Sequence, residues 1–417
     1  MANVSSSNGL EKRPTLSFRD ANGAEFPNWQ RISLGTIIEP YSEKVHGNHD
    51  YEVLTSSREG LQRQTEHFGS KQRHDTDGYN IVPLGFCTYR NRSDDGRFAF
   101  NINKISDKAI VSKFYPVFRF VNANSTFMTE YLNSSARARK KLSVLAVGTS
   151  QVVLSFEALK SAKFDLPCKE EQDKIAALLE CINTRIAQQH AYVNALKKYK
   201  RGLSDELFVE SGTAEDWMTV PFDKAFELLQ NNTFSRNEMS TENGIVYNIH
   251  YGDVLIKYGS MVNLSKSKVP YIRSNVSLSK FAQHSYLRDG DIVIADTAED
   301  YTVGKAVEIV GATGMKALSG LHTIPCRPKL SFAPMYLGYF FNSKRFRTQM
   351  LPLVQGTKVS SISKSEILKT AVVFPSYNVQ SRIASMLYTL DQKIDICNAC
   401  AHELVRVKET LLQQLFI

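Results

Sequence analysis

A repeat inside the chain constrains the fold more than any other feature of the sequence. When Gly148-Thr149 is aligned with Gly356-Thr357, a constant offset of 208 runs without a gap to Phe208 and Phe416 and gives 15 identities in 61 positions. Upstream of the aligned region the offset changes, so the first parts of the two copies differ by insertions. A period of about 200 residues is far longer than the period of a solenoid repeat. The sequence therefore predicts a duplicated domain, with each copy followed by the same segment.

The second part of each copy is predicted to be one long helix. Apolar residues recur in alternating steps of four and three, which is the pattern of a coiled-coil seam. The predicted seam residues are Ile175, Leu179, Ile182, Ile186 and Leu196 in the first copy and Ile383, Leu387, Leu390, Ile394 and Leu404 in the second. Lys200 and Lys408 interrupt the two seams at the same position. Polar seam residues of this kind restrict register and partner choice.

The matching seams predict that the two helices pair with each other. Long segments rather than short loops separate the helices, so we expect antiparallel pairing. The alternative is that each helix packs only on its own domain. Each helical stretch begins just after a proline, Pro167 or Pro375, which suits a helix start.

The remaining segments are predicted to be two mixed domains, which makes the fold class α+β with two long antiparallel coiled-coil helices and an internal repeat. The predicted organisation is a leader at 1–28, a first domain at 29–166, a helix at 167–212, a second domain at 213–374 and a helix at 375–417. Short apolar runs between turn clusters predict strands at 80–82, 99–100, 117–120 and 152–154, and at 253–256, 291–294 and 371–374. One helix is expected in each domain, at 128–133 and 335–342.

Charge is distributed unevenly along the chain, whose formal net charge is +9. Residues 29–166 carry 19 Lys and Arg against 14 Asp and Glu, and residues 217–374 carry 18 against 12. Two basic blocks of similar length suit a protein that binds one polyanion at two places. Mildly basic solvated surfaces would give the same excess of Lys and Arg. No apolar run approaches the roughly 20 residues that cross a bilayer, and the start of the chain has no apolar core of a secretion signal. The six cysteines are unpatterned, which favours a reducing compartment.

Recognisable catalytic motifs are missing from the sequence. It contains no phosphate-binding loop with the Gly-x-x-x-x-Gly-Lys-Ser/Thr pattern, no Gly-rich cofactor turn and no Asn/Asp-Pro-Pro-Tyr/Phe stretch of the kind found in amino-methyltransferases. Cys397 and Cys400 form a single Cys-x-x-Cys pair on a helical stretch, so we expect no metal site. Two basic domains without catalytic motifs favour binding over catalysis.

Candidate DNA-binding residues occur in both domains. Lys and Arg contact phosphates, whereas Arg, Asn, Gln, Ser and Thr read base edges. The candidates are Lys71, Arg73, Tyr89, Arg90, Arg92 and Gln151 in the first domain, and Lys266, Lys268, Arg273, Lys344, Arg345 and Lys358 in the second. The segment from Tyr89 to Arg92 combines an aromatic ring with donors beside a Ser/Asp/Gly turn, which makes it the strongest candidate for base reading.

The duplicated order of several motifs resembles the DNA specificity subunit of type I restriction-modification systems. The motifs of the first copy are Trp29-x-x-x-x-Leu34-Gly35, Gly148-Thr149-x-Gln151 and Leu166-Pro167-x-x-x-Glu171-Gln172-x-x-Ile175-Ala176. The second copy repeats them as Trp217, Gly356-Thr357 and Phe374-Pro375-x-x-x-x-Gln380-x-x-Ile383-Ala384. Two departures are Val379 in place of Glu171 and Val359 in place of Gln151.

The resemblance implies two target recognition domains that each read one half of a bipartite site in double-stranded DNA. It implies that the helices set the spacer between the half-sites and dock the modification subunits. It also implies a prokaryotic cytoplasmic protein of host defence that has no catalytic activity and no cofactor of its own. The implied partners are two methyltransferase subunits, which use S-adenosylmethionine on adenine N6, and two restriction subunits, which use ATP and Mg²⁺ to translocate and cut DNA. The alternatives are a coiled-coil scaffold with two basic binding domains and an enzyme with an unrecognised active site.

Overall fold

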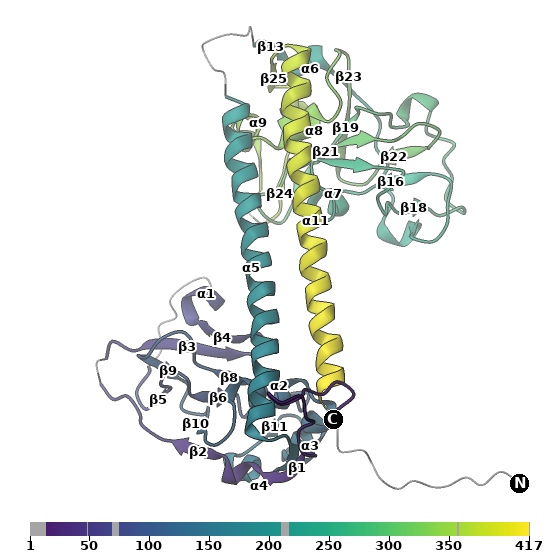
Figure 1. The fold of residues 1–417 in the computed structure, drawn as a ribbon. Coiled ribbons are helices and arrows are strands. Elements are labelled where there is room, and N and C mark those ends of the chain that lie inside the picture. The colour runs from purple at the N-terminus through teal and green to yellow at the C-terminus, as the bar shows by residue number, and fades with distance from the viewer. Residues whose placement is uncertain (1–13, 48, 69–74, 210–216, 357, 417) are drawn as a thin grey trace, which may run out of the picture. The chain divides into compact units, whose positions relative to one another are not determined.

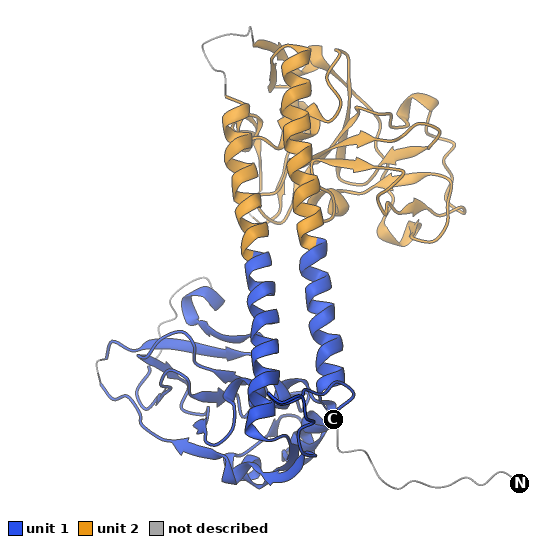
Figure 2. Ribbon diagram, viewed as in Figure 1, with its two compact units in different colours: residues 1–190, 399–417 blue, residues 191–398 orange. Residues whose placement is uncertain are grey.

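The chain forms two compact units, which Figure 2 shows in different colours. Unit 1 comprises residues 1–190 and 399–417, and unit 2 comprises residues 191–398. The computed structural model describes residues 14–47, 49–68, 75–209, 217–356 and 358–416. Both units contain helices and mixed sheets, so the predicted α+β class is confirmed.

The main sheet of unit 1 has four strands in the order β2-β10-β6-β8 (Figure 1). The strands are β2 (Ile38–Tyr41), β10 (Val117–Phe120), β6 (Cys87–Tyr89) and β8 (Phe100–Ile102). Helix α2 (Ser125–Ser134) contacts the edge strand β8, and helix α3 (Ala136–Leu145) follows it. Alternating apolar residues of these strands, including Phe100 and Phe118, are buried in the same core as Phe127 of α2.

Two strand pairs, short helices and a second sheet complete unit 1. β1 (Gln30–Ser33) and β12 (Lys163–Leu166) pair antiparallel where the domain begins and ends, and β7 (Arg92–Ser93) pairs with β11 (Val152–Val153). The short helices are α1 (Gln64–Phe68) and α4 (Phe156–Ser161), with a 3-10 turn at Leu34–Thr36. A second sheet has the order β4-β3-β9-β5, with β4 at Gly60–Arg63, β3 at Glu52–Ser57, β9 at Ala109–Val111 and β5 at Asn80–Ile81.

Unit 2 repeats the main sheet in the order β14-β23-β19-β21 and adds β17 beside β21. The strands are β14 (Phe226–Leu228), β23 (Thr323–Pro328), β19 (Ile292–Ala295), β21 (Ala306–Val310) and β17 (Met261–Asn263). Helix α8 (Tyr336–Asn342) contacts β21, as α2 contacts β8, and α9 (Lys344–Met350) follows it. The two units therefore share a topology despite their different insertions.

The two-stranded pairs of unit 2 correspond to those of unit 1, whereas its second sheet has a different strand order. β13 (Met218–Pro221) pairs with β25 (Ala371–Phe374), and β20 (Thr297–Ala298) pairs with β24 (Ser360–Ser361). The short helices are α6 (Phe222–Ala225), α7 (Tyr251–Ile256) and α10 (Lys364–Ile367), and 3-10 turns lie at Arg236–Glu238, Gln283–Ser285 and Leu351–Leu353. The second sheet has the order β15-β18-β16-β22, with β15 at Met239–Ser240, β18 at Tyr271–Ile272, β16 at Tyr247–Ile249 and β22 at Ala317–Ser319.

Equivalent side chains hold equivalent elements together in the two units. The amide of Asn133 accepts from the backbone N–H of Phe100 and donates to its carbonyl, at 2.9 and 2.8 Å, and so fastens α2 to the edge strand β8. Asn342 does the same with Ala306, at 3.1 and 2.7 Å, and fastens α8 to β21. An apolar residue at either position would leave strand groups without these partners, which explains why an amide side chain recurs there.

The two long helices, α5 (Lys169–Leu207) and α11 (Tyr377–Leu415), each contribute to both units (Figure 1). In unit 1 the start of α5 and the end of α11 share one core, which contains Ile175, Leu179 and Leu415. In unit 2 the start of α11, with Ile383 and Leu387, packs with Leu203 and Leu207 near the end of α5. The start of each helix thus meets the end of the other, as the predicted antiparallel pairing requires.

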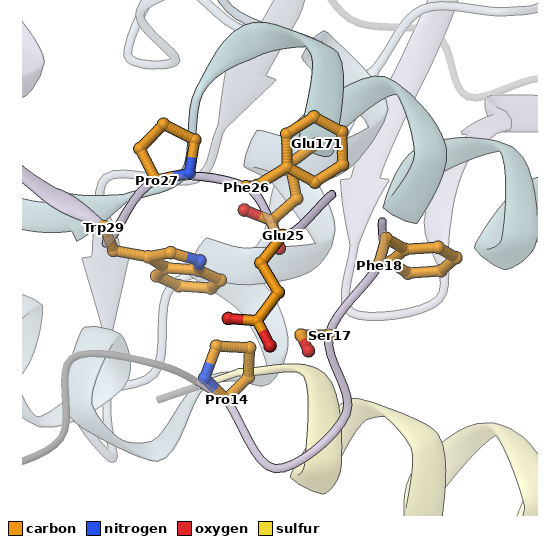
Figure 3. Close-up of a pocket in the computed structure, with 8 residues that line it drawn as sticks. All are labelled: Pro14, Ser17, Phe18, Glu25, Phe26, Pro27, Trp29 and Glu171. Atoms are coloured by element: carbon orange, nitrogen blue, oxygen red, sulfur yellow. The ribbon is translucent and has the colours of Figure 1, made fainter. Parts of the chain in front are cut away.

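The leader packs on unit 1 beside the start of α5. Figure 3 shows Pro14, Ser17 and Glu25 around a small cavity that Trp29 and Glu171 also line. The N–H of Leu16 donates to the carbonyl of Gln414 at 3.0 Å, which ties the leader to the end of α11. Val379, the residue that replaces Glu171 in the second copy, packs instead against the apolar core of unit 2. The departure between the copies thus matches two different environments.

One predicted strand is wrong. Residues 253–256 belong to helix α7 because local contacts favour a helix there. The His250 ring nitrogen accepts from the N–H of Gly252 at the helix start, and Lys257 pairs with Asp253 one turn earlier at 2.8 Å. An apolar run of this length fits a buried helix as well as a strand. Within the described residues, no helix has the length and apolar character needed to span a membrane.

Candidate nucleic-acid interface

Four arginines of unit 1 line one concave surface of about 100 Å³. We call this surface the arginine groove; its arginines are Arg58, Arg90, Arg92 and Arg97, and Ser56, Ser57, Ser93, Asp94 and Ala99 complete its lining. Arg58 lies in the turn between β3 and β4, whereas the other three lie in or beside β7. Two sheets of unit 1 therefore contribute to the groove.

One carboxylate and one aromatic ring contact three of the four guanidinium groups of the arginine groove. Asp95 lies 2.6 Å from Arg58 and 3.9 Å from Arg97, and its hydrogen bonds to the N–H of Arg97, to Ser93 and to Arg58 hold the pKa of this carboxyl below its usual range. The Arg92 guanidinium lies 5.5 Å from the centre of the exposed Phe114 ring. Side chains oriented in this way lose less freedom when they bind a polyanion.

A glycine turn brings Gln151 to the arginine groove. Because β11 pairs with β7, the Gln151 amide reaches Asp94 and donates to its carboxylate at 3.0 Å. The turn requires Gly148, whose φ is +137° and whose position would place a Cβ atom 2.3 Å from the carbonyl oxygen of Gln151. Gly356, with φ +102°, occupies the same place in unit 2. Three predicted residues, Arg90, Arg92 and Gln151, thus lie together.

Unit 2 has a larger concave surface of about 920 Å³ on its second sheet. We call it the basic groove; its cationic residues are Arg236, Lys257, Lys266, Lys268 and Arg273. The stacked rings of Tyr247 and Tyr271, 4.5 Å apart, line it with several hydroxyl side chains. Lys266, Lys268 and Arg273 are candidates from the sequence, and the structure brings these three together.

A fully buried carboxylate positions two cations of the basic groove. Asp253 receives two hydrogen bonds from Arg236, at 2.7 and 2.8 Å, and lies 2.8 Å from Lys257. Burial alone would raise the pKa of Asp253, but the bonds from Arg236 and Lys257 lower it below its usual value. Asp253 therefore stays charged and fixes both cations at the groove wall.

Other predicted contact residues have different surroundings. The prediction for Tyr89 is wrong, because its ring has no exposed surface and its hydroxyl donates to the carbonyl of Leu154 at 3.0 Å inside the core. Arg345 donates to the carbonyl of Phe208, the residue after α5, and packs on the ring of Trp217. It therefore caps the C-terminal end of α5. Lys344 and Lys358 are exposed on the surface of unit 2. Lys71 and Arg73 lie outside the described residues.

Sequence reasoning missed four cations of the two grooves, namely Arg58, Arg97, Arg236 and Lys257. Arg58 and Arg97 each sit in a turn that contains Gly, Glu or Asp, and a search for arginines in turns would have found them. Arg236 and Lys257 carried no such signal, because only folding brings them to Asp253.

All ten predicted seam residues are buried or half-buried. They are Ile175, Leu179, Ile182, Ile186, Leu196, Ile383, Leu387, Leu390, Ile394 and Leu404. Lys200 and Lys408, the polar interruptions of the seam, are also half-buried, and each forms an ion pair.

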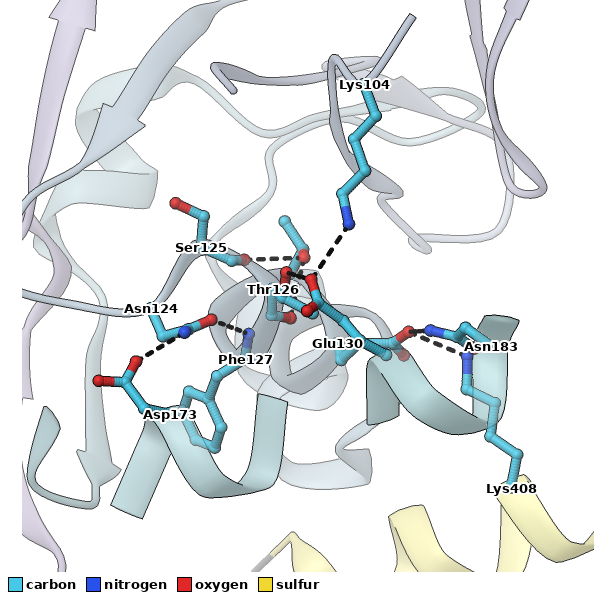
Figure 4. Close-up of polar contacts among 11 residues, drawn as sticks. Lys104, Asn124, Ser125, Thr126, Phe127, Glu130, Asp173, Asn183 and Lys408 are labelled. Atoms are coloured by element: carbon cyan, nitrogen blue, oxygen red, sulfur yellow. Dashed lines mark hydrogen bonds and ion pairs between the residues drawn. The ribbon is translucent and has the colours of Figure 1, made fainter. Parts of the chain in front are cut away.

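A polar network joins α2 to the long helices in unit 1 (Figure 4). Glu130 of α2 accepts from Asn183 of α5 at 3.0 Å and from Lys408 of α11 at 2.9 Å. One turn earlier on α2, Thr126 donates to Glu180 at 2.7 Å, and Asn124, the N-cap residue of α2, donates to Asp173 at 2.7 Å. The network fixes which face of α5 contacts α2 of unit 1.

Comparison with known families shows what the first part of the chain resembles. Residues 29–198 match the type I restriction modification DNA specificity domain. This part of the chain is similar to type I DNA specificity domains. The resemblance predicted from the duplicated motifs is thereby confirmed, and the arginine groove lies within the matched residues.

A relative and two solved structures extend the comparison beyond the specificity domain. The type I restriction enzyme MjaVIII specificity subunit of Methanocaldococcus jannaschii is 21% identical over 288 residues, and the match spans 64% of each chain, just under two thirds of that relative's length. The type I restriction-modification S subunit from M. genitalium aligns with 97% of this chain and 99% of its own, at 14% identity and a TM-score of 0.54. A chain solved in work on complex assembly and conformational transition of the type I R-M system aligns over 94% and 98%, at 15% identity and a TM-score of 0.57. At these identities the structural likeness shows the fold alone.

Proposed function

We propose that this chain is the sequence-specific DNA-binding subunit of a type I restriction-modification complex. Each unit reads one half of a bipartite target in double-stranded DNA. The observation that supports this most is that one scaffold occurs twice and carries a cation-lined groove in each copy. Lys and Arg that neutralise phosphates supply affinity for duplex DNA, while base contacts supply specificity.

The long helices have two roles in this proposal. They set the spacer between the two half-sites, because each helix is continuous over 39 residues and contributes to both units. They also dock the modification subunits. Apolar side chains remain exposed on both helices, including Tyr192 and Tyr199 on α5 and Ile396 and Val407 on α11, and exposed apolar groups on otherwise polar helices suit a protein partner.

The chemistry of the complex belongs to other subunits in this proposal. The chain itself binds and positions DNA, and it needs no cofactor for that. S-adenosylmethionine is used by two modification subunits, and ATP and Mg²⁺ are used by two restriction subunits, in the cytoplasm of a prokaryote. Adenine must leave the base stack to be methylated, so DNA held by the two units has to tolerate local opening.

Shortening the paired helices tests the proposal. Removing residues 187–193 and 397–403 takes one heptad from each helix and keeps both seams in phase. Seven residues correspond to about 10 Å of helix, or about three base pairs of DNA. The chain is co-expressed with its modification subunits, and methylated adenines are mapped by sequencing the host DNA. We expect the same half-sites with a gap shorter by about three base pairs.

Two results of this experiment contradict the proposal. Methylation at the same half-sites with the original gap would show that the helices do not set the spacer. A wild-type chain that directs methylation to no bipartite sequence would reject the function itself. A shortened chain that fails to fold is recognised by its thermal unfolding, and a variant that lacks one heptad from α5 alone then serves as the out-of-register control.

A further inference from the structure

The shared scaffold makes it possible to compare positions in the two units residue by residue. In unit 1 the β7–β11 pairing places Ser93 opposite Val152 and Arg92 opposite Val153. In unit 2 the β20–β24 pairing places Ala298 opposite Ser360 and Thr297 opposite Ser361. Since Val152 and Ser360 are related by the repeat offset of 208, Arg92 corresponds to Thr297 and Arg90 corresponds to Ala295.

Unit 2 has no cationic side chain at either of these equivalent positions. Where unit 1 has the exposed Arg90, unit 2 has Ala295, which has no exposed surface. Where unit 1 has Arg92, unit 2 has Thr297, whose hydroxyl donates to the adjacent Asp296. The residues just after β20 include Glu299 and Asp300, both exposed. Unit 1 has exposed carboxylates at the corresponding positions, Asp94 and Asp95, so the difference is that unit 2 lacks the arginines that could contact phosphates here.

Unit 2 places its cations elsewhere. The basic groove lies on the second sheet, whose strand order β15-β18-β16-β22 mixes parallel and antiparallel pairs. Lys266 and Lys268 are exposed there, and Arg273 is fixed by a hydrogen bond from its Nε to the carbonyl of Met239 at 2.9 Å. The residues that line this groove come from 236–273, whereas β20, the counterpart of β7, lies at Thr297–Ala298. The cationic surfaces of the two units therefore arise from different elements.

We propose that the two units read their half-sites through non-equivalent surfaces. Unit 1 uses the arginine groove beside β7, and unit 2 uses the basic groove on its second sheet. This inference rests on the proposed function, because it assumes that both units contact DNA. Arginine forks pair with O6 and N7 of guanine in the major groove, so the half-site of unit 1 contains guanine at the position read by Arg90 or Arg92.

Selection from a pool of random DNA duplexes tests the inference with the full chain in complex with its modification subunits. Three variants are compared with the wild type: Arg90→Ala/Arg92→Ala, Lys266→Ala/Lys268→Ala/Arg273→Ala and, as the matched control, Glu299→Ala/Asp300→Ala. We expect the first variant to lose preference at one half-site by about tenfold or more at a guanine. The second loses affinity at the other half-site, and the control selects the wild-type sequence.

The outcomes separate this inference from the proposed function. If the wild type selects no bipartite sequence, the function itself is wrong. If the wild type selects one and Glu299→Ala/Asp300→Ala alters the half-site of unit 2, then unit 2 reads DNA at the same place as unit 1 and the inference is overturned. Unchanged half-sites in both arginine and lysine variants would overturn it too. Thermal unfolding of each variant identifies any loss that comes from misfolding, and Arg90→Lys/Arg92→Lys then tests the fork geometry in a variant that keeps the charge.

Discussion

Lys200 and Lys408 occupy the same position in the two copies of the repeat, yet the carboxylates that neutralise them come from different elements. Lys200 of α5 pairs with Asp391 of α11 at 2.5 Å, whereas Lys408 of α11 pairs with Glu130 of α2 at 2.9 Å. Asp391 also accepts from the hydroxyl of Tyr339 on α8 at 2.7 Å. In each unit, therefore, the contacts of one seam lysine link α5 and α11 to a helix of the domain, which is α2 in unit 1 and α8 in unit 2.

Removing either seam lysine should destabilise its unit. Lys200→Ala or Lys408→Ala leaves a half-buried carboxylate without its cation, which we expect to lower the free energy of unfolding by about 1–3 kcal/mol. The measurement is chemical denaturation followed by circular dichroism. The control is Arg406→Ala, which breaks the exposed Arg406–Glu403 pair on the same helix as Lys408 and should cost less than about 0.5 kcal/mol. Equal decreases in the free energy of unfolding in all three variants would contradict the inference that the seam lysines stabilise the contact between the long helices and α2 or α8.

Replacing glycine by alanine should lower the stability of the chain at Gly148 and raise it at Gly202. Gly148→Ala forces a Cβ atom against the carbonyl of Gln151 at positive φ, and we expect a loss of at least about 1–2 kcal/mol. Gly202→Ala lies in the helix interior of α5 with open space around it, and we expect a gain of about 0.5–1 kcal/mol. Thermal unfolding of the two variants provides the comparison. A stable Gly148→Ala chain would show that the turn adopts another conformation.

A buried glutamine at the start of each long helix should be difficult to replace. Gln172 donates to the carbonyl of Pro167 and accepts from the N–H of Asn124, both at 2.9 Å. Gln380 makes the same two bonds, to Pro375 and from Ala333. We expect Gln172→Leu to cost about 2–3 kcal/mol in denaturant unfolding, because it leaves buried backbone groups without partners. Gln188→Leu, at an exposed position of the same helix, should leave stability nearly unchanged.

Acid should destabilise unit 2 through His250. Burial, and then the charge of Arg236, lower the pKa of His250 to about 4, below the value near 6.5 expected for the unfolded chain. The unfolded state therefore binds the proton first, and stability that is complete above about pH 6.5 is lost as the pH falls toward 4. We expect the loss to reach about 1–2 kcal/mol relative to His250→Asn, which keeps an acceptor at the start of α7. Parallel pH profiles for the two proteins would contradict the assignment.

Salt should weaken DNA binding less steeply after two lysines are removed. Each phosphate contact adds about 0.9 to the slope of log K against log salt for duplex DNA. Lys266→Ala/Lys268→Ala should therefore lower the slope by about 1–2, as measured by fluorescence anisotropy with a duplex of any sequence. The control is Lys197→Ala/Lys198→Ala, two exposed residues of α5 outside both grooves. A larger effect in the control would place the DNA contact on the helix.

The repeat, the seams and the α+β class could be predicted because they depend on periodic patterns that survive in a single chain. Val117–Phe120 and Ala371–Phe374 are strands as expected, and α2 and α8 lie at the expected helices. The 253–256 segment was misassigned because short apolar runs do not distinguish a strand from a buried helix, and the capping His250 precedes the run. Tyr89 was misassigned because nothing in its neighbours shows that β6 lies inside the main sheet.

The two grooves could be predicted only in part. Arg90, Arg92 and Gln151 were identified from residue type, but only the pairing of β7 with β11 brings Gln151 next to the two arginines. Asp253 could not be predicted as a partner of Arg236 at all. The two residues meet only because the 3-10 turn at Arg236–Glu238 packs against helix α7. Long-range packing of this kind leaves no periodic signal in one sequence.

The core of unit 1 contains Phe416, which packs against Phe127 and Tyr131. The core of unit 1 is thus completed by side chains that are synthesised after those of unit 2. During synthesis, the strands of unit 1 keep apolar surface exposed to solvent until the last turn of α11 has been made. All residues of unit 2 are made before that point, so unit 2 can fold earlier. Chaperone dependence should accordingly concentrate on the module that is translated first.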